Sequence, residues 1–192
     1  MSTTDVVPIG RVRRRPTPAA AAPDLKALAE TLARQLDGEV RFDGGSRALY
    51  ATDGSNYRQV PMGVVIPRHK VDVLTTIDVC RQFGAPLLSR GGGTSLAGQC
   101  CNVAVVMDMS KYLHGILALD PGARQARVLP GTVLDTLRTA ANVHDLTFGP
   151  DPSTHNHCTL GGMIGNNSCG VHSLIGLGTG RTSDQVDELE IM

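Results

Sequence analysis

Ser-Arg-Gly-Gly-Gly-Thr-Ser-Leu-Ala-Gly-Gln, residues 89–99, directly follows the apolar run Pro86-Leu87-Leu88, which is typical of the start of a strand. Three consecutive glycines after a strand remove the Cβ atoms from one side of the backbone, so that successive N–H groups can converge on an anion. The hydroxyls of Thr94 and Ser95 add further donors. These residues favour a diphosphate ligand. The alternative that they leave open is a glycine-rich turn without a ligand.

Two common phosphate-binding motifs do not fit this loop. Walker A requires a lysine and a hydroxyl residue after its second glycine, but Gln99 and Cys100 stand at those positions. A GxGxxG motif that begins at Gly91 requires a third glycine where Leu96 stands. The sequence therefore disfavours a nucleoside triphosphatase and a standard Rossmann dehydrogenase.

The segments around the loop follow a strand, helix, strand order, which indicates an α/β unit with a partly parallel sheet. Further along the chain, the turn signal Asp120-Pro121-Gly122 separates two apolar runs and predicts a hairpin. We expect helices over about 23–37, 70–83 and 131–142, strands at about 40–42, 64–66, 86–88, 103–107, 116–119, 126–129 and 186–191, and a long loop over 148–183.

Composition excludes several classes of partner. The 192 residues include 18 basic and 18 acidic side chains and no Trp, so the sequence implies neither nucleic acid nor an anionic membrane as a partner. The five cysteines form no CxxC pair, which argues against a disulfide framework and favours a reducing compartment. Four well-spaced metal ligands are missing, so we expect no metal site. No apolar run reaches the roughly 18 residues of a membrane span.

A second glycine-rich segment, Thr159–Gly170, reads TLGGMIGNNSCG and again allows a ligand to approach the backbone closely. It lies roughly 70 residues after the first loop. Two such segments suggest one extended ligand that is held from two sides, and a dinucleotide fits this better than a single phosphate. The alternative is two independent structural turns.

Five motifs occur in an order that resembles a known family: GVVIP at 63–67, the loop at 90–99, Pro130-Gly131, PDPS at 150–153 and GGMIGNN at 161–167. They resemble the FAD-binding domain of FAD-linked oxidases of the p-cresol methylhydroxylase and vanillyl-alcohol oxidase type. The most similar branch holds D-lactate dehydrogenases, the glycolate oxidase flavin subunit and D-2-hydroxyglutarate dehydrogenases. The resemblance covers about residues 39–192.

This resemblance implies an α+β fold, with FAD in the cleft of a two-subdomain FAD-binding domain. Some relatives hold FAD covalently through a His after the loop glycines, and Thr94 at that position implies non-covalent FAD. The first loop should bind the pyrophosphate, the PDP segment should lie along the flavin or ribityl side, and the second glycine segment should form the opposite wall. The cofactor-binding residues implied are Arg90, Gly91, Gly92, Gly93, Thr94, Ser95, Gly98, Gln99, Pro150, Asp151, Pro152, Gly161, Gly162, Gly165, Asn166 and Ser168.

The resemblance also implies a domain organisation. We expect a disordered tail at 1–22 and a FAD-binding domain at 23–192, made of an N-terminal α/β subdomain at about 39–112 and the start of a second subdomain at about 113–192. In the family this second subdomain continues through further strands, and a cap domain then supplies the substrate pocket. The second subdomain is therefore expected to be truncated at Met192, with the catalytic residues, which remain unknown, in the region beyond it.

The implied activity is oxidation of a small D-2-hydroxy acid, of the lactate, glycolate or 2-hydroxyglutarate type, with hydride transfer to flavin N5. Electrons would pass to an Fe–S domain or a quinone, and the enzyme would be cytoplasmic, either free or held at the membrane surface by its acceptor. Two alternatives remain open: a truncated, catalytically inactive FAD-fold fragment, and a nucleotide- or phosphate-binding module without redox function.

Two smaller groups of residues have competing interpretations. His155, His157 and Cys158 could bind a metal, form a polar loop near the flavin, or lie on an ordinary surface loop. Asp53 and Tyr57 either lie near the cofactor or belong to a structural turn, and the residue pattern favours the turn.

Overall fold

The computed structural model describes residues 22–172 and 180–192, so the tail predicted at 1–22 falls almost entirely outside the described residues. Helix α1 (Leu25–Gln35) follows, and the Asp24 carboxylate caps it by accepting the backbone N–H groups of Lys26 and Ala27. Pro23, where the expected helix over 23–37 would begin, therefore lies before the cap. Leu28 and Leu32, four residues apart on one face of the helix, are fully buried.

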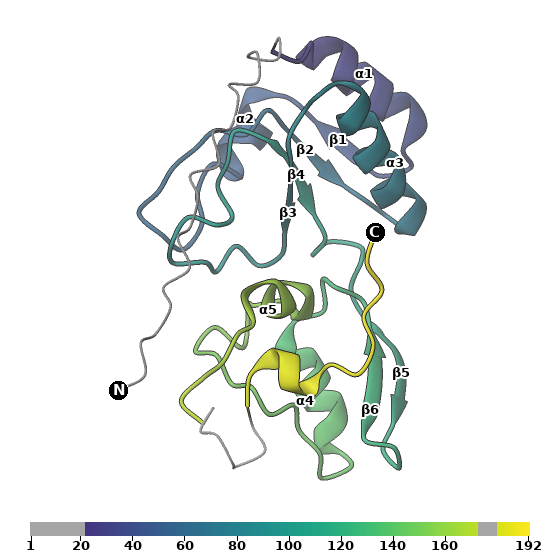
Figure 1. Cartoon of the computed structure of the whole chain (residues 1–192), viewed down its shortest axis with the longest axis vertical. Helices are drawn as coiled ribbons and strands as arrows, with labels where there is room; N and C mark the ends of the chain where they lie inside the picture. Colours follow the sequence, from purple (N-terminus) through teal and green to yellow (C-terminus); the bar gives the residue numbers. More distant parts are fainter. Residues whose placement is uncertain (1–21, 173–179) are drawn as a thin grey trace, which may run out of the picture.

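A four-stranded sheet forms the centre of the first lobe, which extends from α1 to the last strand of this sheet (Figure 1). Its strands have the spatial order β1-β2-β4-β3, with β1 antiparallel to β2 and the other neighbours parallel. This arrangement confirms the partly parallel sheet predicted from sequence. The strands are β1 (Glu39–Arg41), β2 (Gly63–Ile66), β3 (Leu87–Arg90) and β4 (Val105–Asp108).

Helices α1 and α3 (Lys70–Gln82) pack side by side on one face of this sheet (Figure 1). The core beneath them joins Leu32 of α1, Val79 of α3, and the central-strand residues Val65 and Val105, all almost inaccessible to solvent. Both β2 and β4 are buried along their whole length, as continuous apolar runs in a parallel sheet should be.

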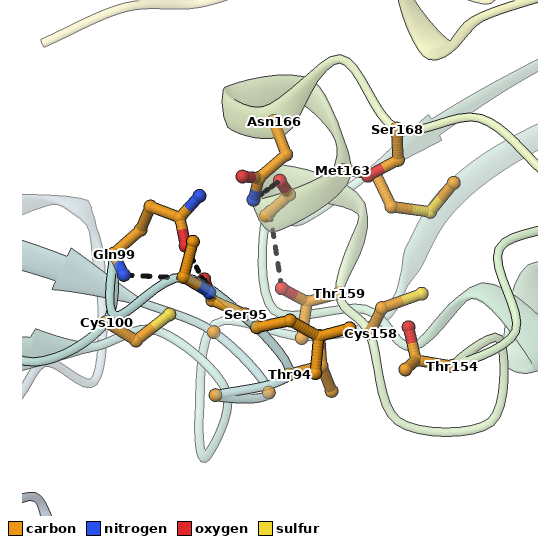
Figure 2. Close-up of a pocket in the computed structure, with 16 residues that line it drawn as sticks. Thr94, Ser95, Gln99, Cys100, Thr154, Cys158, Thr159, Met163, Asn166 and Ser168 are labelled. Carbon is orange, nitrogen blue, oxygen red and sulfur yellow. Dashed lines mark hydrogen bonds between the residues drawn. The ribbon is translucent and has the colours of Figure 1, made fainter. Parts of the chain in front are cut away.

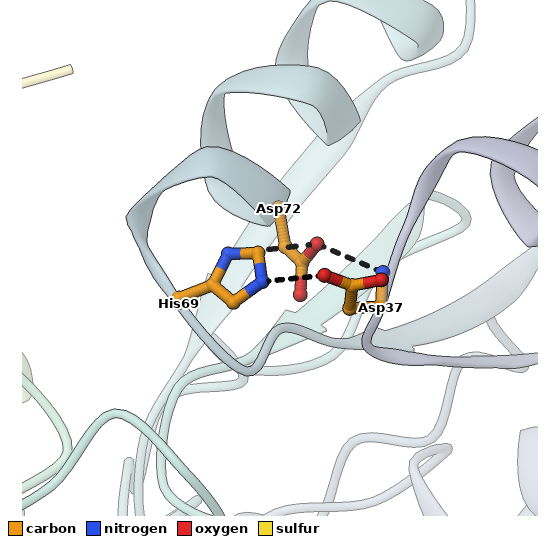
Figure 3. Close-up of side chains that lie close together, drawn as sticks. All are labelled: Asp37, His69 and Asp72. Atoms are coloured by element: carbon orange, nitrogen blue, oxygen red, sulfur yellow. Dashed lines mark hydrogen bonds and ion pairs between the residues drawn. The ribbon is translucent and has the colours of Figure 1, made fainter.

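The buried Asp72 ties the end of α1 to the start of α3 (Figure 3). One of its carboxylate oxygens accepts the backbone N–H of Asp37 at 3.1 Å, and the other accepts that of Arg68 at 2.8 Å. His69 lies beside the pair, with its Nε2 3.0 Å from the Asp37 carboxylate. These contacts satisfy a carboxylate that would otherwise be costly to bury.

A short helix, α2 (Gly44–Leu49), was not expected from the sequence. It buries no side chain, so it shows no apolar periodicity that would reveal it. The Asp43 carboxylate caps it by accepting the backbone N–H of Ser46 at 2.8 Å.

The second lobe contains the predicted hairpin, β5 (Ile116–Asp120) and β6 (Gln125–Val128), and the predicted helix, α4 (Leu134–Asn142). Helix α5 (Leu160–Asn166) and the 3-10 helix η1 (Thr182–Gln185) complete it (Figure 1). Its small core is built from Leu134, Leu137, Cys158, Leu160 and Met163.

Two predictions in this lobe are wrong. The expected long loop over 148–183 contains α5, whose glycines conceal a short buried face formed by Leu160 and Met163. The expected strand at 186–191 does not form, although the segment is described. Its acidic side chains instead contact cationic or amide partners, including Glu188 with Arg127 at 3.1 Å and Glu190 with Lys70.

No helix in the described ranges has the combination of length and apolar character that crossing a bilayer requires.

Candidate functional site

A pocket of about 260 Å³ lies between the loop that follows β3 and helix α5, and thus between the two lobes (Figure 2). The loop lies at the carboxyl end of a parallel strand, the edge of a sheet where ligands most often bind in α/β proteins. The first lobe contributes Gly91, Gly92, Gly93, Thr94, Ser95, Leu96, Ala97, Gln99 and Cys100, and the second contributes Thr154, Cys158, Thr159, Gly162, Met163, Asn166 and Ser168.

The lining is polar and apolar in similar parts, and among the described residues that form it the two thiols are the only ionisable side chains, because no Asp, Glu, Lys, Arg or His belongs to it. The backbone N–H groups from Gly91 to Thr94 donate no hydrogen bond to any described residue. Exposed consecutive N–H groups of this kind form an anion-binding concavity. The site therefore offers neutral donors to a negatively charged ligand.

Side-chain hydrogen bonds within the loop fix its far half. The Ser95 hydroxyl accepts the backbone N–H of Gln99 at 3.4 Å, and the Gln99 side-chain oxygen accepts that of Ala97 at 3.2 Å (Figure 2). These bonds turn the end of the loop back on itself. Both halves of the loop line the pocket, and the first half carries the free N–H groups.

The first two loop glycines also allow the lobes to touch. A Cβ atom on Gly91 would lie 2.1 Å from the hydroxyl oxygen of Thr159, and one on Gly92 would lie 2.2 Å from the carbonyl oxygen of His157. Both distances are far below van der Waals contact. The glycines are therefore needed for packing between the lobes as well as for any ligand.

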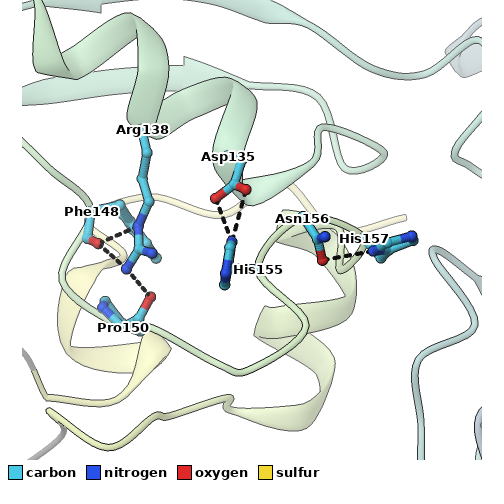
Figure 4. A network of polar contacts seen from close by, with 7 residues as sticks. All are labelled: Asp135, Arg138, Phe148, Pro150, His155, Asn156 and His157. Carbon is cyan, nitrogen blue, oxygen red and sulfur yellow. Dashed lines mark hydrogen bonds and ion pairs between the residues drawn. The ribbon is translucent and has the colours of Figure 1, made fainter.

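Helix α4 holds the second wall in place (Figure 4). Arg138 donates to the carbonyl oxygens of Phe148 and Pro150 at 3.0–3.2 Å, and His155 contacts the Asp135 carboxylate at 2.7 Å. These contacts fix the chain just before Cys158, so that the following residues reach the pocket from a supported position.

The possible metal ligands His155, His157 and Cys158 do not converge. His155 faces Asp135, the His157 ring contacts Asn156, and Cys158 is buried in the second lobe's core (Figure 4). Among the described residues, one group brings three possible ligands within 4.8 Å: Asp37, His69 and Asp72 (Figure 3). Asp72 in that group already accepts two backbone N–H groups, so the group serves the junction of α1 and α3.

Burial raises the pKa of both pocket thiols, Cys100 and Cys158, above the usual range. Both thiols therefore stay protonated near neutral pH. Because the thiolate and not the thiol is the nucleophile, neither residue is suited to covalent chemistry.

The turn that contains Asp53 and Tyr57 supports the loop from behind. The Asp53 carboxylate accepts the backbone N–H groups of Ser55 at 2.9 Å and Cys100 at 3.2 Å. Burial favours the neutral carboxyl, but the hydrogen bond from the Ser55 hydroxyl, together with these two N–H bonds, outweighs it and keeps the Asp53 pKa below its usual value. The Tyr57 ring lies under Gly98, where a Cβ would come within 2.8 Å of it. Neither side chain lines the pocket.

The structure brings together nine of the sixteen residues singled out from sequence. The other seven lie outside the lining: Arg90 binds backbone carbonyls, Asp151 contacts His172, Gly161 packs on Pro130, and a Cβ on Gly165 would meet open space. The nine are Gly91, Gly92, Gly93, Thr94, Ser95, Gln99, Gly162, Asn166 and Ser168, and those outside the lining are Arg90, Gly98, Pro150, Asp151, Pro152, Gly161 and Gly165.

The sixteen residues omitted seven that line the pocket: Leu96, Ala97, Cys100, Thr154, Cys158, Thr159 and Met163. Of these, Cys158 had been considered from sequence as part of a polar loop near the flavin. Leu96, Ala97 and Cys100 could have been found by extending the loop motif over every position. Met163 and Thr159 could be found only once α5 was known, because residues three or four apart on a helix lie on the same face.

Comparison with known proteins gives the following relations. Residues 61–192 match a family described as FAD binding domain. The chain is 37% identical over 158 residues to the D-2-hydroxyglutarate dehydrogenase of Pseudomonas putida. The aligned part makes up 79% of this chain and 15% of that protein. It is 36% identical over 128 residues to the glycolate oxidase subunit GlcD of Escherichia coli, covering 65% of this chain and 26% of the relative.

Solved structures show the same fold at low sequence identity. A BBE-like 1 protein of Physcomitrella patens superposes with a TM-score of 0.67 at 22% identity, over 82% of this chain and 34% of that one. A substrate-bound p-cresol methylhydroxylase superposes with a TM-score of 0.65 at 16% identity, over 74% of this chain and 29% of that one. The chain thus spans about a sixth to a third of the length of these proteins. Because the family match extends over more than half of its length, the chain belongs to the FAD binding domain family, and FAD is its cofactor.

Proposed function

We propose that this chain is the FAD-binding portion of a flavin-dependent oxidoreductase that oxidises a small D-2-hydroxy acid, and that the pocket between its lobes holds FAD without a covalent bond. The row of unused N–H groups from Gly91 to Thr94 carries the proposal, because a pyrophosphate is the ligand that such a row fits. No histidine belongs to the part of the lining that the structure describes, and both of its thiols are protonated, which supports non-covalent binding.

On this proposal, each part of the pocket would contact a different part of the cofactor. The loop N–H groups and the Thr94 hydroxyl would bind the pyrophosphate, with Gly98 and Gln99 closing the loop. Contact between the lobes at Gly92 and His157 would exclude water from one side of the pocket. Pro150, Asp151 and Pro152 would lie along the flavin or ribityl side, and Gly161, Gly162, Gly165, Asn166 and Ser168 would form the second wall.

When bound, the flavin supplies the redox chemistry by accepting a hydride at N5. The described pocket carries no carboxylate or imidazole to take the proton from a substrate hydroxyl. We therefore propose that the catalytic base and the substrate pocket belong to the part of the relatives' length that this chain does not cover. On this proposal, the 192-residue chain by itself binds cofactor without turnover.

The substrate class rests on the relatives. Their names refer to D-2-hydroxyglutarate, glycolate and D-lactate, which share a hydroxyl group next to a carboxylate. We propose that the electron acceptor is an Fe–S domain or a quinone. We also propose that the protein is cytoplasmic, either free or held at the membrane surface. Five free cysteines agree with a reducing compartment.

A visible absorption spectrum, recorded after FAD addition and desalting, tests the cofactor site. Flavin bands should persist with the unmodified protein and be lost with the double variant Gly92→Asp and Gly162→Asp, because both changes place a carboxylate at the neutral pocket and the first also overlaps the His157 carbonyl at the contact between the lobes. Gly44→Asp is the matched control, since a Cβ on Gly44 meets nothing within 4 Å. Flavin retained equally by the double variant, with circular dichroism unchanged, would rule out this pocket.

Turnover tests the substrate class. In a protein extended to the length of the relatives, D-2-hydroxyglutarate, glycolate or D-lactate should reduce an artificial acceptor. Reduction by none of the three, in protein that retains flavin, would refute the proposed substrate class and leave the cofactor site standing.

A further inference from the structure

Arg90 ends β3 at the point where the glycine loop begins, yet its side chain is absent from the pocket lining. Its guanidinium donates to three backbone carbonyls: that of Thr52 at 2.8 Å, that of Cys100 at 3.2 Å and that of Tyr50 at 3.3 Å. It also lies over the Tyr50 ring, 5.3 Å from the ring centre. The side chain thus joins the start of the loop to its end and to the turn behind it.

Gly93 shows why the loop depends on this contact. Its φ of +65° is a left-handed conformation, and a Cβ there would lie 2.6 Å from Nη2 of Arg90. The loop therefore turns directly over the guanidinium. The Gly93 carbonyl in turn accepts the backbone N–H of Gly54 at 2.9 Å. The turn behind the loop is therefore bonded to the loop through Gly54 as well as through Thr52.

We propose that Arg90 is a positioning residue for the cofactor: a clamp behind the loop that keeps the N–H groups from Gly91 to Thr94 directed at the pocket, without itself contacting a phosphate. This proposal rests on the proposed cofactor site. The hydrogen-bond acceptors of the Arg90 guanidinium are all neutral backbone carbonyls, which belong to Tyr50, Thr52 and Cys100. Such a task needs the planar fork of a guanidinium, because a lysine ammonium carries the same charge but cannot span the three carbonyls in that geometry.

Hydrogen exchange of the cofactor-free protein tests the clamp by itself. The amides of Gly54 and Cys100 donate the hydrogen bonds that join the loop to the turn behind it. In Arg90→Lys and Arg90→Met these amides should exchange roughly tenfold faster, because the loop and the turn are no longer held together by the guanidinium. The amide of Met62, which is bonded to Ala104, should not change. Unchanged exchange at both Gly54 and Cys100 would overturn the proposal.

FAD titration at low and high salt separates positioning from direct charge pairing. Both variants should lose FAD affinity to similar extents, by roughly tenfold or more. The salt dependence of FAD binding should stay the same as in the unmodified protein. If Arg90→Lys keeps full affinity while Arg90→Met loses it together with part of the salt dependence, Arg90 pairs directly with phosphate and the proposal is wrong.

Arg81→Met is the matched control, because Arg81 is exposed on α3 and pairs only with Asp78, one turn away. If the unmodified protein binds no FAD at all, the proposed cofactor site fails. The exchange measurement still decides whether Arg90 is a clamp.

Discussion

The two glycine-rich segments look alike in sequence but contribute to the pocket in different ways. The first, after β3, has no regular structure in its glycine run and leaves the backbone N–H groups from Gly91 to Thr94 unused. The second forms α5, whose N–H groups are used within the helix or, at its start, by the carbonyls of Thr132 and Pro130, so that it reaches the pocket mainly through side chains such as Asn166 and Thr159. Glycine content therefore marks a close approach of chains, but it does not say whether backbone or side chains do the binding.

The largest test of this comparison changes one glycine in each segment. Gly91→Ala should destabilise the protein by about 1–3 kcal/mol, because the new methyl group would overlap the Thr159 hydroxyl. Gly165→Ala on α5 meets nothing within 4 Å and should be neutral, or stabilising by up to about 1 kcal/mol through helix propensity. Urea unfolding measures both changes.

A double-mutant cycle identifies the cause of the Gly91 effect. Thr159→Gly removes the group that the alanine would strike, so the double variant should recover about 1 kcal/mol or more relative to the sum of the single changes. Strict additivity would show that the contact between the lobes is not responsible.

A medium effect is expected from adding charge to the second wall. Asn166→Asp keeps the shape of the side chain but places a carboxylate in a lining without charged groups. FAD affinity should fall by roughly tenfold or more at low salt, and by less at high salt, because repulsion of the pyrophosphate is screened. Asn102→Asp, on an exposed loop outside the pocket, is the control and should leave affinity unchanged. Equal losses in both variants would remove Asn166 from the site.

The smallest effect concerns the sheet that supports the loop. Hydrogen bonds from Lys111, Tyr112 and Arg41 lower the pKa of Glu39 to about 2. A carboxyl with a lowered pKa adds stability above its usual pKa of 4.5, and this stability is lost as the pH falls toward 2. Glu39→Gln should therefore lower stability at pH 7 and reduce the loss on acidification. Glu30→Gln, at an exposed position on α1, should not change this acid dependence.

The regular elements were largely predictable because each carries its own periodic signal. Leu28 and Leu32 mark α1, and the apolar runs of β2 and β4 mark strands that are buried on both faces. Prediction failed where this signal is weak or misleading. Helix α2 buries no side chain, α5 hides two apolar residues among glycines, and the apolar residues of 186–191 pair with no strand among the described residues.

For the site, the sequence by itself determined the cofactor class. A triple glycine with flanking hydroxyls removes Cβ atoms and supplies donors wherever the loop is placed, and the ordered motifs around it identify the family. Only the tertiary structure decided the roles of single residues. It turned Arg90 toward carbonyls behind the loop, set Gly91 against Thr159, and made the second glycine segment a helix. These roles depend on contacts between segments far apart in the chain, and local residue patterns do not encode such contacts.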